Sequence, residues 1–73
     1  MLGRAVDRAR RARYPMGEAE ALIGLARAWR PLGAVDKALG CAQEAIAIAD
    51  ALGLTRVRAQ ADAEHAAAYR RRA

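Results

Sequence analysis

The chain has 73 residues, of which 21 are alanine, and its formal net charge is +5. This length allows at most one small domain, spanning 1–73, and an alanine-rich interior buries little apolar area. A single cysteine excludes an internal disulfide, and no apolar run approaches the length of a membrane span. We therefore expect a cytoplasmic protein.

The sequence as a whole indicates an all-α protein. Prolines and β-branched residues are scarce, and no window alternates apolar and polar residues with period two.

The N-terminal third predicts one short helix. Small apolar residues recur at helical spacing among arginines over about 2–13. Tyr14-Pro15 should end this helix, because the residue before a proline avoids the α region.

The middle of the chain predicts a helical hairpin. A helix over about 18–31 carries an apolar stripe at spacings of 0, 3, 4 and 7, made by Leu22, Leu25, Ala26 and Trp29. Pro31 should end or bend it, and Leu32-Gly33 should form the corner with Gly33 as a left-handed cap. A longer helix over about 34–52 is apolar on two sides, which is typical of a helix sandwiched between neighbours, and Gly53 should cap it.

A fourth helix is predicted over about 55–72, where Val57, Ala61, Ala68 and Tyr69 carry the apolar content. Four residues of the second helix recur forty positions later, as Ala59, Ala61, Tyr69 and Arg70. A second similarity between two segments of the chain has a different period, so the sequence does not fix one repeat length. The predicted core comprises Leu22, Leu25, Ala26, Trp29, Leu32, Gly33, Val35, Ala38, Leu39, Ala42 and Ile46.

The hairpin resembles a tetratricopeptide repeat over about 18–53, with half-repeats on either side. That family places large apolar, leucine, small and aromatic residues in the first helix, an apolar-glycine corner, and small residues in the second helix. The matching positions are Leu22, Leu25, Ala26, Trp29, Leu32-Gly33, Ala38 and Ala45. Three residues depart from the pattern: Ala42 replaces a usual aromatic, Pro31 precedes the corner, and Asp50 replaces a closing proline. The longer second helix is similar to repeats in large bacterial transcriptional regulators.

The resemblance implies stacked antiparallel hairpins that bind another protein in a groove lined by the first helix of each hairpin. By that geometry the groove residues are Ile23, Arg27, Arg30, Ala63, Ala67 and Arg70. Guanidinium groups pair bidentately with carboxylates, so an acidic or C-terminal peptide is the expected ligand. Exposed arginines that only meet solvent are the simpler interpretation of the same residues.

The arginine-rich first helix supports an alternative function. Arg4, Arg8 and Arg11 share one side of it, as in a small helical protein that binds nucleic acid. No aromatic residue interleaves with them and Asp7 interrupts them, which favours a solvated polar face. A helix lying on an anionic membrane surface carries less weight, because its apolar side is mostly alanine.

No catalytic residue, cofactor site or metal site is predicted, so we expect a protein that is not an enzyme. His65 has only Asp62 and Glu64 near it in sequence, which makes an exposed or structural histidine the better reading than a metal ligand. Cys41 is predicted to be a small buried apolar residue. Trp29 is predicted to be a core residue rather than a binding hot spot. The predicted function is protein–protein interaction or self-association, as a homo-oligomer or as part of a larger chain.

Overall fold

Four antiparallel helices form the fold, and no strand occurs among residues 3–72, which the computed structural model describes. The helices are α1 (Arg4–Arg11), α2 (Pro15–Trp29), α3 (Val35–Leu52) and α4 (Thr55–Arg72). The all-α prediction is confirmed. Leu2, within the range expected for the first helix, lies outside the described residues, as does Ala73.

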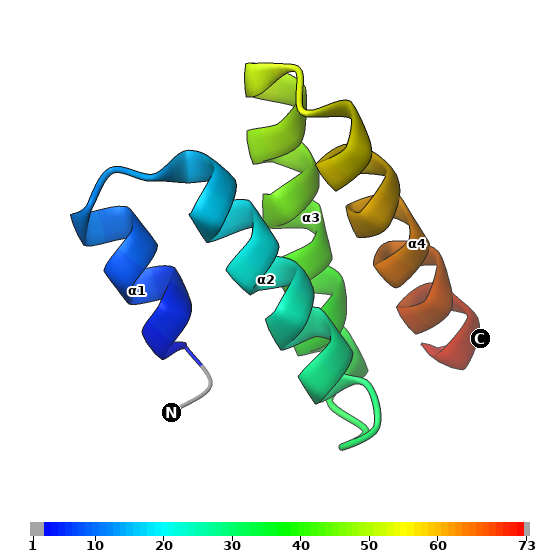
Figure 1. The fold of residues 1–73 in the computed structure, drawn as a ribbon. Coiled ribbons are helices and arrows are strands. Elements are labelled where there is room, and N and C mark those ends of the chain that lie inside the picture. The colour runs from blue at the N-terminus through cyan, green and yellow to red at the C-terminus, as the bar shows by residue number, and fades with distance from the viewer. Residues whose placement is uncertain (1–2, 73) are drawn as a thin grey trace.

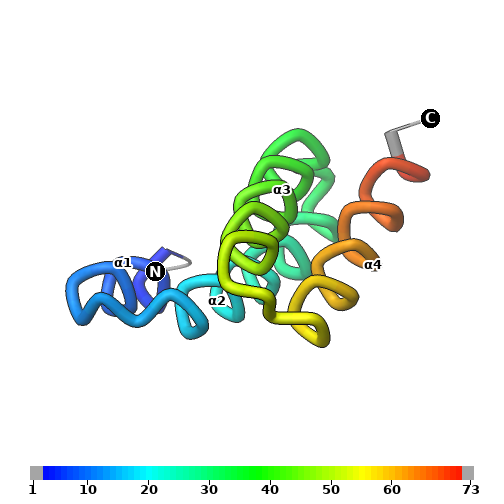
Figure 2. Tube along the Cα trace, turned by 90° about the horizontal axis from the view of Figure 1, so that it is seen from above, coloured from blue at the N-terminus to red at the C-terminus, as the bar shows by residue number. Residues whose placement is uncertain are grey.

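Helix α2 lies at the centre of the arrangement. It packs against α1, α3 and α4, whereas α1 packs against α2 alone. Figure 1 shows α2 and α4 running in one direction and α1 and α3 in the other. In Figure 2, α3 lies over α2 and α4, and α1 flanks α2 on the side away from α4. The result is an open row of helices rather than a closed bundle.

The three turns between helices are built alike and evenly spaced. Each turn closes with a backbone hydrogen bond from the residue before the next helix to a carbonyl five residues earlier, at 2.8–3.1 Å. The donor–acceptor pairs are twenty residues apart along the chain: Tyr14 to Ala9, Ala34 to Trp29, and Leu54 to Ala49. This is the Schellman geometry, in which the residue before the donor is left-handed.

The left-handed residues keep the same spacing. Gly33 has φ 78° and Gly53 has φ 67°, so both predicted glycine caps are confirmed, and Arg13 takes the equivalent place with φ 53°. The structure therefore repeats every twenty residues per helix and every forty per hairpin. The forty-residue period agrees with the spacing at which residues of the second helix recur in the sequence. It exceeds the roughly 34 residues of an ordinary tetratricopeptide repeat.

Alanine dominates the interior. Among the residues whose burial is described, nine of the fourteen buried apolar side chains are alanine. On α3 the buried stripe contains four of them, each at most 1 % exposed: Ala38, Ala42, Ala45 and Ala49. These four share two core clusters with apolar residues of both α2 and α4. Methyl side chains hold helix axes at the short end of the usual separation, so α3 lies close to both neighbours.

The structure corrects several predicted details of α2 and the following corner. Helix α2 begins at Pro15 rather than near residue 18, because proline suits the first helical position, where no backbone donor is needed. Its fully buried stripe is set three residues earlier than predicted, at Ala19, Leu22, Ile23 and Ala26. Leu25, Trp29, Val35 and Ile46 are partly buried against the core clusters. Leu32 and Gly33 are wrong as core residues, because both project from the corner into solvent, with Leu32 68 % exposed.

Two leucines provide a matched test of this core. Leu22 is 3 % exposed and lies in the larger core cluster, whereas Leu32 is in the corner. We expect Leu22→Ala to lower the free energy of unfolding by about 2–5 kcal/mol, because it leaves a cavity among close-packed alanines. Leu32→Ala should change it by less than about 0.5 kcal/mol. Urea unfolding followed by circular dichroism measures both, and equal losses would contradict the assignment.

Candidate functional site

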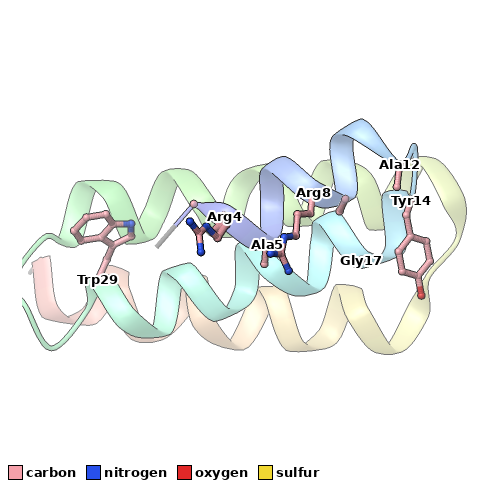
Figure 3. A pocket seen from close by; sticks show the side chains of 9 residues that line it. Arg4, Ala5, Arg8, Ala12, Tyr14, Gly17 and Trp29 are labelled. Atoms are coloured by element: carbon pink, nitrogen blue, oxygen red, sulfur yellow. The ribbon is translucent and has the colours of Figure 1, made fainter. Parts of the chain in front are cut away.

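An open, mostly apolar surface groove of about 1160 Å³ runs along α1 and α2. Figure 3 shows Trp29 at one end of it, Tyr14 at the other, and Arg4 and Arg8 between them. The floor is formed by small residues: Gly3, Ala5, Ala9 and Ala12 beside α1, and Gly17 on α2. Exposed apolar concavities of this kind on small proteins are typical of binding surfaces.

Local structure fixes the aromatic ends of the groove. The Tyr14 ring lies over Gly17, where a Cβ atom would collide with it, so glycine is required for this contact. At the other end, the Lys37 ammonium lies 4.5 Å from the centre of the Trp29 ring. This cation–π contact positions the indole from α3 while part of it remains exposed.

Two arginines of the groove wall are free to meet a ligand. Arg4 and Arg8 are exposed, and neither takes part in the ion pairs within residues 3–71. Arg10, on the same helix, is instead held by Glu18 at 2.9 Å and Glu44 at 3.3 Å. The hydrogen bond to Glu18 raises the pKa of Arg10, so this guanidinium is engaged by carboxylates of α2 and α3 rather than free for a ligand.

The groove predicted between α2 and α4 is largely occupied by the protein's own contacts. Ile23 is buried in the core and does not line a groove, because the α2 stripe is rotated relative to the predicted one. Arg27 and Arg30 both contact the same carboxylate, Glu64 of α4. Ala63 and Arg70 are exposed and Ala67 is partly exposed, so only the α4 half of the predicted surface is open.

Glu64 is the residue that sequence reasoning missed. It is 9 % exposed, and its Oε2 accepts a hydrogen bond from Arg27 Nε at 2.8 Å. Its Oε1 lies 3.5 Å from Arg30 Nη1, is buried, and accepts no hydrogen bond. The signal was present in the spacing, because Glu64 continues the buried stripe of α4, formed by Val57, Ala61, Glu64 and Ala68. A carboxylate on such a stripe requires a cationic partner from a neighbouring helix.

The other candidate residues have structural surroundings. His65 stacks on Tyr69, with ring centres 6.4 Å apart. Burial raises the pKa of the partly buried Cys41 thiol, which lowers its thiolate fraction at neutral pH. Within residues 3–72, no group of three or more His, Cys, Asp or Glu residues is placed to hold a metal ion. None of the helices described there is both long and apolar enough to cross a bilayer.

Comparison with known proteins adds no relative: no family model, no curated protein and no solved structure matches this chain.

The contact between Glu64 and the two arginines should contribute measurably to stability. Glu64→Gln leaves two guanidinium groups without their carboxylate, although the Arg27 side chain is 56 % exposed and partly solvated. We expect a loss of about 1–2 kcal/mol in the free energy of unfolding.

Glu44→Gln is the matched control, because the Arg10–Glu44 pair is more than half exposed on both sides. It should cost at most about 0.5 kcal/mol. Urea unfolding of both variants tests this, and a cost for Glu64→Gln no larger than that of the control would show that the pair does not fasten α4.

Proposed function

We propose that this chain is a non-catalytic module for protein–protein interaction or self-association, tetratricopeptide-like in build, and part of a bacterial regulatory protein. The observation that carries the proposal is the open apolar groove along α1 and α2, with a partly exposed tryptophan and an exposed tyrosine at its ends. Such aromatic residues dominate the binding energy of protein interfaces.

The arrangement of helices supports the same proposal. Helix α1 packs against α2 alone, and the outer face of α4, which includes Ala59, Ala63 and Ala66, is exposed. Rows of repeated hairpins of this kind present extended surfaces to partner proteins. The forty-residue period supports a helical repeat longer than the ordinary tetratricopeptide unit.

Nucleic-acid binding is the rival function, and exposed Arg4, Arg8 and Arg11 on α1 favour it. The apolar floor beside Arg4 and Arg8 is unlike the polar, strongly basic surfaces that contact phosphates. Phosphate contacts would make any such binding fall steeply with salt, which separates the two functions experimentally.

The test is a paired binding experiment. A displayed library of random helical peptides should yield binders that remain bound at high salt, because apolar contacts are not screened. Binding to a random-sequence DNA duplex should be weak and disappear by roughly 150 mM salt. The triple variant R4Q/R8Q/R11Q serves as the control, since it removes duplex binding while leaving the groove floor intact. Duplex binding that persists at physiological salt, with no peptide enriched, would contradict the proposed function.

A further inference from the structure

The regular spacing of the helices makes different parts of the chain structurally equivalent. Because turns recur every twenty residues, α4 is equivalent to α2 and α1 to α3, with a shift of forty residues. In the complete unit, α3 is covered by α2 on one side and α4 on the other. Helix α1 is covered by α2, which takes the place that α4 takes beside α3. No helix within residues 3–72 takes the place that α2 takes beside α3. The groove therefore lies where a helix equivalent to α2 would pack on α1.

The face of α2 beside this groove has the pattern of an interface. Helix α4 buries positions 57, 61, 64 and 68 against α2 and α3. Forty residues earlier, the equivalent face of α2 consists of Gly17, Ala21, Gly24 and Ala28, none of which is fully buried. These small residues leave room for a helix to approach the α2 backbone closely.

The outer face of α4 is the complementary surface. The residues by which α2 packs into the core correspond, forty positions later, to Ala59, Asp62, Ala63 and Ala66, all of them exposed. Tyr69 occupies the position equivalent to Trp29 and is 59 % exposed. One end of the molecule thus presents an unfilled position for a helix of the α2 type, and the other end presents a helix of that type with its packing face uncovered.

We infer that α4 of one copy docks in the groove between α1 and α2 of the next copy, so that copies stack head to tail. This inference rests on the proposed interaction function and specifies one partner for it. The interface is heterologous, because each copy contributes a different surface to each of its two contacts. The row of helices would continue from one copy to the next with the same order and packing of helices as within a copy.

Charges at the junction are consistent with a second copy. Asp62 takes the position of Leu22, which clusters with Ala45 and Ala49 and with the partly buried Ile48. The equivalents on the next copy are Ala5, Ala9 and Arg8. Asp62, which accepts a hydrogen bond from Arg58 of its own helix at 3.1 Å, would therefore also face an exposed guanidinium. Since Asp62 is already paired within its own helix, apolar burial drives the contact and its strength should depend weakly on salt.

Two single substitutions test the inference, each on an exposed residue so that the monomer still folds. Ala5→Lys blocks the groove, and Ala63→Lys blocks the α4 face at the position equivalent to buried Ile23. Sedimentation over a concentration series should show open-ended association of the unmodified chain. Each variant alone should associate at least about tenfold more weakly, because docking would bury an unpaired ammonium group. Ala47→Lys, exposed on α3, should associate as the unmodified chain does.

The decisive sample is an equimolar mixture of the two blocked variants. One has an intact α4 face and the other an intact groove, so they should form a heterodimer and nothing larger. A mixture that stays monomeric, or an unmodified chain that is monomeric at every concentration, would overturn head-to-tail stacking. If the peptide library nevertheless yields binders, only this inference fails and the proposed function stands.

Discussion

The alanine stripe of α3 is the constraint on which the rest of the structure depends. Ala38, Ala42, Ala45 and Ala49 are almost completely inaccessible, and both α2 and α4 contribute to the clusters that contain them. Methyl groups contribute little burial each, so stability has to come from close approach along the whole length of the helices. A core of this kind has no room for larger side chains, and it fixes how α2 and α4 lie side by side.

The polar contacts of the fold follow from that packing. With α2 and α4 held together, Glu64 lies within reach of Arg27 and Arg30, and the three residues fasten the two helices where few large apolar side chains are present. Two of the three arginines predicted to line a ligand groove, Arg27 and Arg30, therefore make contacts within the fold. Exposed binding capacity is left at the ends of the row, on α1 and on the outer face of α4.

Local signals in the sequence were sufficient to predict much of the fold. The helical period of apolar residues gave four helices, and Gly33 and Gly53 marked two of the three turns because both adopt positive φ. The third turn was harder to specify, since Arg13 takes the left-handed position in place of glycine. Pro15 was interpreted as a stop signal, whereas it opens α2 at the position where a proline costs nothing.

The candidate site was less predictable because it depends on contacts between distant residues. Two overlapping stripes on α2 share the same 0, 3, 4, 7 spacing, and only the packed structure shows that the one containing Ile23 is buried. The groove depends on where α1 lies relative to α2, which no local pattern specifies. Glu64 was within reach of sequence reasoning, since its place on a buried stripe of α4 signals an ion pair across helices.

A comparison of two alanine substitutions on α3 tests the central claim most directly. Ala42 is fully buried in the stripe, whereas Ala47 is exposed on the same helix. If close approach through alanine holds the fold together, Ala42→Leu lowers the free energy of unfolding by about 1–3 kcal/mol, because the extra carbon atoms force the helices apart. Ala47→Leu changes it by less than about 0.5 kcal/mol. An Ala42→Leu protein as stable as the unmodified chain, or more stable, would show that the alanine stripe has room for larger side chains, and would contradict the account.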